Sequence, residues 1–344
     1  MKLWNMDAIS VKRILAIVLI ALLVPYALAE LSVHFLDVGQ GDAALLICDG
    51  ETMLIDGGPA SASQFIYSYL RQKTDHLDYI IATHPHEDHV GGLAAALNAV
   101  PVDVILSPVE TYDNSAFEAM QRYANEQGTS IIVPYEGDEF FFGGGVVTIL
   151  HCWPEAWAEN DMSICLRIDY GETSFLFTGD AEAMSEYMMI DSGMPLKADV
   201  LKVGHHGSGS SSTREFIDTV KPQYAVISCG KNNSYGHPHA ETLDSLSGIK
   251  ILRTDELGTI IMNTDGEMVT VEEGSVPNII VIDNKEESTS NNEASTYIGN
   301  KNSMKFHYPD CEGVRKMNPK NKVPIDTRED AISMGFTPCG MCKP

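Results

Sequence analysis

The chain has 344 residues and a formal net charge of −25 at pH 7, so it can bury a substantial core as one large domain with an appendage or as two ordinary domains. Residues 297–344 hold eight Lys or Arg against five Asp or Glu, which leaves a net charge of −30 for residues 30–296. A surface this acidic repels nucleic acid at long range. Binding of nucleic acid by the large domain would therefore need a local cationic site or help from the tail.

The N-terminus has the features of a secretory signal peptide. Lys12 and Arg13 precede an apolar run at 14–24, and Ala27 and Ala29 form the small-x-small pattern of a signal peptidase site. We therefore expect residues 1–29 to be removed, leaving a secreted protein with no stable membrane association. The alternative is an uncleaved membrane anchor, for which the apolar run is short.

The mature chain begins with a pattern typical of a β-meander. Strands are expected at 31–38, 43–48 and 52–55, separated by turn-forming residues such as Gly39-Gln40-Gly41-Asp42. A helix is expected at 63–72 and a further strand at 77–82, and this strand leads into a polar loop.

That loop, residues 83–92, reads Thr-His-Pro-His-Glu-Asp-His-Val-Gly-Gly and holds three imidazoles and two carboxylates in six consecutive positions. Neutral imidazoles and carboxylates are common protein ligands for zinc, and a string dense enough for two ions predicts a hydrolytic centre with an open position. The alternative is a histidine-rich surface loop, which the preceding strand and Gly91-Gly92 disfavour.

The rest of the large domain alternates strands and helices in the same way. Elements are expected at 102–106, 115–126, 130–133, 146–150, 163–169, 173–178, 181–189, 199–203 and 224–228, with closing strands within 251–271. Polar loops containing Asp180, His205-His206 and His237 each follow a strand. Because sheets of this type place their chemistry at strand ends, we expect these loops to form one site.

The order Asp56, His84-x-His86-x-Asp88-His89, Asp180, His237 resembles the metallo-β-lactamase fold superfamily over residues 31–271. The resemblance implies an α/β (α+β) fold, a four-layer αββα sandwich. Three strings, at 35–42, 201–208 and 235–239, resemble the ComEC-type competence-protein branch, whose extra domain is implicated as a nuclease in DNA uptake. Here that domain would be secreted and free-standing.

The same resemblance implies the roles of the site residues. His84 and His86 would bind one divalent metal, Zn or Mn, and Asp88 and His89 the second, with Asp180 bridging and His237 completing the second site. Asp56 is interpreted as an acceptor that fixes an imidazole tautomer. His205 and His206 would contact the substrate or leaving group; the alternative is that they form a turn.

One position departs from the superfamily pattern. A further histidine usual before Gly179-Asp180 is absent, and that neighbourhood reads Glu159-Asn160-Asp161. The first metal site is then oxygen-rich or under-coordinated, with Asn160 or Asp161 as substitutes, which favours manganese. A site with one metal is the alternative.

Other polar residues are given supporting or structural roles. Asp37 and Gln40 are interpreted as residues behind the site, although Gln40 and Asp42 also suit a plain turn. His34 and His151 are expected to be structural, and His239 a helix cap or surface group. The large-domain cysteines are expected to be small buried residues, and the alternative is that one pair of them is bridged: Cys48, Cys152, Cys165 and Cys229.

The C-terminal part carries an independent signal. Residues 30–274 are predicted to form the hydrolase domain, 275–295 a flexible linker and 296–344 a compact module. In the module, His307-x3-Cys311 and Cys339-x2-Cys342 form a tetrahedral pattern for one structural zinc, and a disulfide with an odd thiol is the alternative.

Both ends of this module resemble Ada-like metal-binding modules. Its basic residues would supply a cationic face for phosphates, or alternatively only a solvated surface: Lys301, Lys305, Arg315 and Lys316.

These observations predict a secreted metal-dependent phosphodiesterase that acts on DNA, in which hydroxide generated at the metals attacks phosphorus. Asp88, His205 and His206 are its expected catalytic residues. One alternative is an acyl-bond hydrolase acting on β-lactams, lactones or thioesters, favoured mildly by the acidic domain. Another is a non-catalytic DNA-binding surface protein whose tail carries the activity.

Overall fold

A computed structural model describes residues 30–272, 297–309, 311–325, 328–339 and 342. The predicted signal peptide (1–29) and linker (275–295) lie outside the described residues. In the part that is described, no helix is long and apolar enough to cross a membrane.

The first sheet contains eight strands in the order β15-β14-β1-β2-β3-β4-β5-β6. Strands β1, β2 and β3 form the predicted antiparallel meander, and β3 to β6 run parallel. The strands are β1 (Leu31–Phe35), β2 (Ala44–Cys48), β3 (Glu51–Ile55), β4 (Leu77–Ile81), β5 (Val102–Leu106), β6 (Ile131–Ile132), β14 (Ile260–Thr264) and β15 (Val269–Val271).

The second sheet contains seven strands in the order β13-β12-β11-β10-β9-β8-β7. Strands β10 to β13 run parallel, so their carboxyl ends lie at one edge of the sheet. The strands are β7 (Glu139–Phe142), β8 (Gly145–His151), β9 (Cys165–Tyr170), β10 (Thr173–Phe177), β11 (Val200–Lys202), β12 (Tyr224–Ile227) and β13 (Lys250–Arg253).

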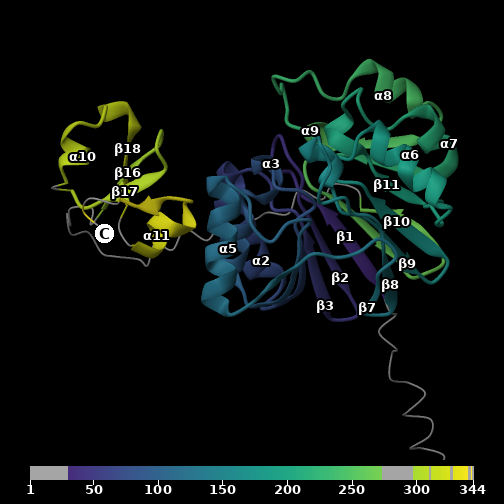
Figure 1. Cartoon of the computed structure of the whole chain (residues 1–344), viewed down its shortest axis with the longest axis horizontal. Helices are drawn as coiled ribbons and strands as arrows, with labels where there is room; N and C mark the ends of the chain where they lie inside the picture. The colour runs from purple at the N-terminus through teal and green to yellow at the C-terminus, as the bar shows by residue number, and fades with distance from the viewer. Residues whose placement is uncertain (1–29, 273–296, 310, 326–327, 340–341, 343–344) are drawn as a thin grey trace, which may run out of the picture.

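The two sheets pack face to face, and helices cover their outer faces (Figure 1). Fully buried residues of both sheets fill the space between them, including Phe35 and Phe177, whose ring centroids lie 5.7 Å apart. The first sheet is covered by α2 (Ser63–Lys73), α4 (Leu93–Ala99) and α5 (Ser115–Gln127), and the second by α6 (Ala183–Ser192), α7 (Arg214–Val220) and α8 (Ala240–Ser245). The predicted four-layer αββα sandwich is therefore confirmed.

Short helices lie in the loops at the strand ends. They are η1 (Ala60–Ala62), α3 (Glu87–Val90), η2 (Glu159–Met162), η3 (Gly204–Gly207) and α9 (Thr254–Leu257). The sequence analysis did not identify α4, β7, α7 or α8. These elements are short, and β7 has three consecutive phenylalanines (residues 140–142) rather than the alternation of a half-buried strand.

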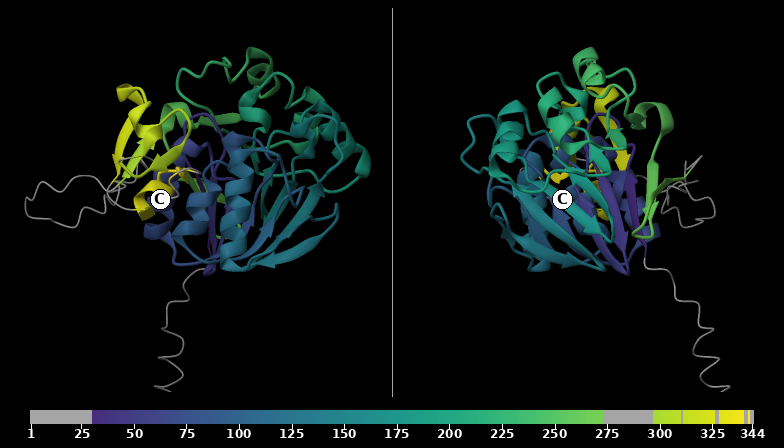
Figure 2. Two further views of the ribbon diagram at one scale, coloured as in Figure 1. Left: turned by 60° about the vertical axis from the view of Figure 1, so that its left-hand side comes forward. Right: turned by 90° about the vertical axis from the view of Figure 1, so that its right-hand side faces the viewer.

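The C-terminal unit is a small sheet with the order β18-β16-β17-β19. Its core contains Phe306, Ile325, Ala331 and Phe336. Its helix α11 packs against α2 and α4 of the large domain, and Figure 2 shows the unit beside these helices. Its elements are β16 (Tyr297–Asn300), β17 (Lys305–His307), α10 (Glu312–Arg315), η4 (Pro319–Asn321), β18 (Lys322–Ile325), α11 (Arg328–Ser333) and β19 (Thr337–Pro338).

Candidate metal centre

A polar cavity of about 510 Å³ opens where the loops after β4, β10, β11 and β12 meet, as the sequence predicted. These loops contribute histidines and carboxylates from positions far apart in the chain. Eleven residues line the cavity: Gln40, Pro59, His86, Glu87, Asp88, Asn160, Asp180, His205, His206, Tyr235 and His237.

Asp56 orients His89 from beneath the cavity. Its carboxylate accepts hydrogen bonds from the backbone N and Oγ1 of Thr83 at 2.8 and 2.7 Å, and Nδ1 of His89 lies 2.8 Å from its Oδ2. Because Nδ1 donates to this carboxylate, Nε2 of His89 can offer its lone pair to a metal. Asp56 therefore lies where the sequence analysis expected a tautomer-fixing acceptor.

His206 is oriented in the same way from the opposite wall. Its Nδ1 lies 3.1 Å from the backbone oxygen of Ser228 and 3.1 Å from Oδ1 of Asp42. Its Nε2 lies 3.3 Å from Asp88 Oδ2 and 3.4 Å from Asp180 Oδ2. The buried His206 thus directs Nε2 at the same carboxylate that faces His89, which is a ligand geometry rather than that of a turn residue.

His84 and His86 form the other half of the centre. Nε2 of His84 lies 3.0 Å from Nδ1 of His86 and 3.8 Å from Asp180 Oδ2. Nε2 of His86 lies 2.7 Å from Glu159 Oε2 and donates to it, which leaves the lone pair on Nδ1. Burial and the neighbouring His89 hold the pKa of His84 well below its ordinary value, so that this imidazole is neutral.

The donor atoms fit two divalent cations that share Asp180. His84, His86 and Asp180 form one group, and Asp42, His89, Asp180 and His206 form another, with ligand atoms within 4.8 Å of one another in each group. The buried atoms without a hydrogen-bond partner include His89 Nε2, Asp180 Oδ1 and His206 Nε2. Unpaired buried polar atoms are costly, and cations at this position would satisfy all three.

Burial opposes the ionisation of Asp180, yet His206 and His89 hold its pKa well below the ordinary value. The same contacts raise the pKa of the two imidazoles. Burial would lower the pKa of His89 and of His206, but Asp180 raises both well above the ordinary value. Cations that bind here would therefore displace protons from these imidazoles.

The remaining predicted residues take different positions. Asp88 lines the cavity, and His205 lies at its edge with Nε2 3.8 Å from Asp180 Oδ2. His237 lines it too, with its ring centroid 6.3 Å from that of His206, but belongs to neither group of close ligand atoms among the described residues. Asp180 does not cap a helix, since Glu182 precedes the first residue of α6.

Asn160 and Asp161, the two alternatives predicted to replace the missing histidine, take different roles. Asp161 Oδ1 accepts hydrogen bonds from the backbone N of Glu182 and from Ser185 Oγ, so this carboxylate is committed to the start of α6. Asn160 donates through Nδ2 to Glu182, and its Oδ1 is buried without a partner beside the cavity. Asn160 thus has a side-chain oxygen beside the cavity that it could offer a metal or substrate.

Of two further predicted residues, the fold places one at the cavity and the other away from it. Gln40 lines the cavity, and its Oε1 accepts a hydrogen bond from the backbone N of Gly230. Asp37 is exposed in a turn, where its Oδ1 accepts from the backbone N of Gly39. Asp37 is thus not among the residues that line the cavity.

Three residues around the centre escaped the sequence analysis. Glu159 accepts from His86 and from the hydroxyl of Tyr112, and Lys202 contacts Asp42. Lys202 could have been found, since a lysine inside the apolar strand β11 requires a buried partner. Glu159 and Tyr112 had no comparable signal, because their link to His86 depends on loop geometry.

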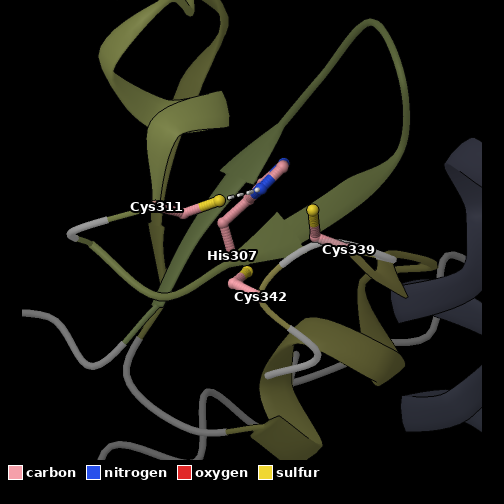
Figure 3. A group of neighbouring side chains, drawn as sticks. All are labelled: His307, Cys311, Cys339 and Cys342. Carbon is pink, nitrogen blue, oxygen red and sulfur yellow. Dashed lines mark hydrogen bonds between the residues drawn. The ribbon is translucent and has the colours of Figure 1, made fainter.

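The C-terminal unit brings together its four predicted ligands, His307, Cys311, Cys339 and Cys342 (Figure 3). His307 Nδ1 lies 3.4 Å from Cys311 Sγ, and no disulfide joins any of the seven cysteines, all of which lie among the described residues. Burial, together with the thiols of Cys311 and Cys339, raises the pKa of Cys342 to about 11. Zinc would stabilise the thiolates that this crowding disfavours, so the group fits a tetrahedral zinc site.

The chain is similar to several known proteins. A sequence model described as the Metallo-beta-lactamase superfamily matches residues 36–231. ComE operon protein 3 of Bacillus subtilis is 33% identical over 258 residues, covering 69% of this chain and 33% of that protein. Competence protein ComA of Neisseria gonorrhoeae is 30% identical over 236 residues, covering 67% and 32%. The chain thus spans about a third of the length of these relatives.

Among solved structures, the chain is similar to the metallo-beta-lactamase fold protein YhfI from Bacillus subtilis. The two share 14% sequence identity and a TM-score of 0.49, and the similarity covers 69% of this chain and 100% of that one.

Proposed function

This chain belongs to the metallo-β-lactamase superfamily and is a metal-dependent hydrolase, and we propose that the bond it hydrolyses is the phosphodiester bond of DNA. The predicted resemblance to the superfamily and to its competence-protein branch is confirmed by the family match and by relatives named as competence proteins. The proposal of DNA as substrate is supported by those relatives.

The observation that carries the proposal is the sharing of Asp180 between two ligand groups at the wall of an open cavity. Two divalent cations bound there would lower the pKa of a water molecule and stabilise charge that develops on a phosphate. His84, His86 and Asn160 would hold the first cation, and His89, His206 and Asp88 the second. Asp56, Ser228 and Glu159 would hold the proton of each ring on the nitrogen that faces away from the cations, which aims the other nitrogen at them.

His205 is placed to assist the leaving oxygen. Its Nδ1 lies 3.1 Å from Ser210 Oγ and 3.4 Å from Glu182 Oε1, and its Nε2 points at the carboxylate of Asp180 across the cavity edge. The backbone of His205 and His206 has φ of +48° and +53°, which is costly for residues other than glycine. This strain supports a role for both imidazoles in the chemistry.

The tail would supply a zinc-stabilised surface for the DNA backbone. Lys301, Lys305 and Arg315 are exposed, and the four zinc ligands lie in the same small unit. These cations would offset the repulsion between the acidic large domain and a polyanion. We also propose that the protein is secreted, on the strength of the signal-peptide pattern at residues 12–29.

The test is incubation of the purified protein with plasmid and linear DNA in Mn²⁺, Mg²⁺ or Zn²⁺. We expect cleavage by the wild type, its loss in His86→Ala, and its retention in the control His76→Ala. His76 lies next to Asp103 before β4, at the end of that strand opposite to the cavity. DNA that stays intact with the wild type in all three metals would remove the proposal.

An acyl-bond hydrolase is the second candidate. The observation that favours it is the cavity lining, which includes Glu87, Asp88 and Asp180 but no Lys or Arg among the described residues. Such a lining suits a substrate that is not a polyanion. Hydrolysis of nitrocefin or of a lactone, without any cleavage of DNA, would establish this candidate instead.

A further inference from the structure

Two large aromatic side chains project into solvent from segments that contribute to the cavity wall: Tyr235 lines the cavity, and Trp157 precedes the lining residue Asn160 by three positions. Trp157 has a relative exposure of 101%, and Tyr235 of 64%. Most large apolar side chains of the described chain are buried, and exposed aromatic groups beside a cavity are typical of ligand contact rather than of packing.

Trp157 is exposed although the loop that carries it is firmly held. The neighbouring Ala156 is buried, and η2 begins two residues later, where Glu159 bonds to His86 and Asn160 lines the cavity. Asp161, at the end of this segment, accepts hydrogen bonds from the first turn of α6 and from the residue before it. The indole is thus presented to solvent from a held backbone, three residues before Asn160 of the cavity wall, which lowers the entropic cost of binding.

Tyr235 is presented from a second loop that is also held in place. The side chain of Asn233 accepts from the backbone N of Tyr235 and of His237 and donates to the backbone O of Gly230. The phenol ring stacks on the imidazole of His237 with centroids 5.5 Å apart and planes inclined by 25°. One ring face is therefore supported by His237, while much of the rest of the ring remains exposed.

The charge around the cavity limits how a polyanion could be held there. Glu87, Asp88 and Asp180 line it, without a Lys or Arg among the described lining residues, and Lys231 is the exposed basic residue of the Tyr235 loop. Ion pairs with phosphates, the usual source of affinity for nucleic acid, are therefore scarce at this site. Stacking of bases on aromatic rings does not depend on such charges.

We propose that Trp157 and Tyr235 stack on unpaired nucleobases, so that the DNA enters the metal centre as a single strand or a frayed end. The inference rests on the proposed function and adds the form of the substrate. A duplex hides the faces of its bases, and only unpaired bases can stack on an exposed ring. Both rings accept any base, so this contact carries no sequence preference.

The test measures binding by fluorescence anisotropy with phosphorothioate oligonucleotides, which resist hydrolysis, of about twelve nucleotides. Three ligands are compared: a single strand, the matching duplex, and a single strand with abasic positions. The full-length protein is used as wild type, Trp157→Ala, Tyr235→Ala and the control Phe141→Ala. Phe141 is 77% exposed on β7 and does not line the cavity, which makes it a matched exposed aromatic.

We expect the wild type to bind the single strand more tightly than the duplex or the abasic strand. Trp157→Ala and Tyr235→Ala should each weaken single-strand binding about tenfold, within the range of stacking energies per base, while Phe141→Ala binds like the wild type. Equal binding of the normal and abasic strands, or wild-type affinity in both of these variants, would overturn the inference.

Cleavage of plasmid DNA and of an unmodified single-stranded oligonucleotide, assayed in parallel, separates the two failures. If the wild type cleaves DNA but its binding ignores the bases, only the stacking inference is lost. If the wild type neither binds nor cleaves DNA, the proposed function is lost with it.

Discussion

Lys202 Nζ lies 2.6 Å from Asp42 Oδ2, and both side chains are buried beneath the metal centre. Lys202 also donates to the backbone oxygen of Val203. Burial alone would raise the pKa of Asp42, but the Lys202 ammonium and the His206 imidazole hold it below its ordinary value. This ion pair fixes the carboxylate that faces Nδ1 of His206, and so connects the core of the second sheet to the site.

Lys202→Met should therefore destabilise the fold by about 3–5 kcal/mol, because the buried Asp42 carboxylate would lose its ammonium partner. The double variant Lys202→Met/Asp42→Asn should recover much of this loss, since neither charge then remains. Urea unfolding followed by circular dichroism measures both. A single variant as stable as the wild type would show that the pair does not hold Asp42 ionised.

His206→Ala should remove about one metal ion per chain from the centre, whereas His237→Ala should keep both. The reason is that His206 Nε2 lies within 3.4 Å of both Asp88 and Asp180, while the His237 ring lies outside both ligand groups. Metal content after dialysis, measured by mass spectrometry, distinguishes the two variants. If His237→Ala loses a metal and His206→Ala does not, the ligand of that metal is His237 instead of His206.

Glu159→Gln should weaken binding at the first metal position about 10- to 100-fold, the usual cost of losing a partner behind a ligand. The carboxylate fixes which nitrogen of His86 is protonated, and Tyr112 and His86 together hold the pKa of Glu159 below its ordinary value. Competition with a chelator measures the affinity. Glu155→Gln, an exposed carboxylate earlier in the same loop, is the control and should have no effect.

The free energy of unfolding should decrease as the pH is lowered from 6.5 to 4, because His34 is protonated in the unfolded chain. Burial, aided by Lys73, lowers the pKa of His34 to about 4, while the unfolded chain titrates near 6.5. As the pH falls below 6.5, His34 binds a proton in the unfolded state but not in the folded state. About 3 kcal/mol of stability is therefore lost by pH 4.

The check is the free energy of unfolding of wild type and His34→Asn at pH 4.5 and 7.5. Other groups titrate in both proteins, so the difference between the two pH responses isolates His34. Wild type and variant with the same pH response would contradict the prediction.

Cys342→Ser should remove one zinc from the C-terminal unit and leave the metal content of the large domain unchanged. The unit has only two clusters of four buried residues each, and one of them contains Cys311 and Cys339, so loss of the metal should also unfold it. Zinc content and limited proteolysis of the full chain measure the two effects. Cys229→Ser, a buried cysteine outside the cluster, is the control and should keep all metals.

Much of the fold followed from local pattern. The apolar runs predicted most strands of both sheets within one to three residues, because period-two alternation and turn residues act over short distances. Strand β7 and helices α7 and α8 were missed, since segments this short have too few residues for a period to appear. In the same way, the Cys-x-x-Cys hook and His307-x3-Cys311 predicted the C-terminal cluster from spacing alone.

The sequence by itself determined which loops carry the imidazoles and carboxylates, and that the loops follow strand ends. Only the tertiary structure decided which atoms meet. The direction of His206 depends on Ser228 and Asp42, and that of His86 on Glu159, all from other parts of the chain. A histidine can bind a metal through one ring nitrogen when a hydrogen bond to the other nitrogen fixes its orientation. The residue that accepts this hydrogen bond becomes a neighbour only after the sheets have packed.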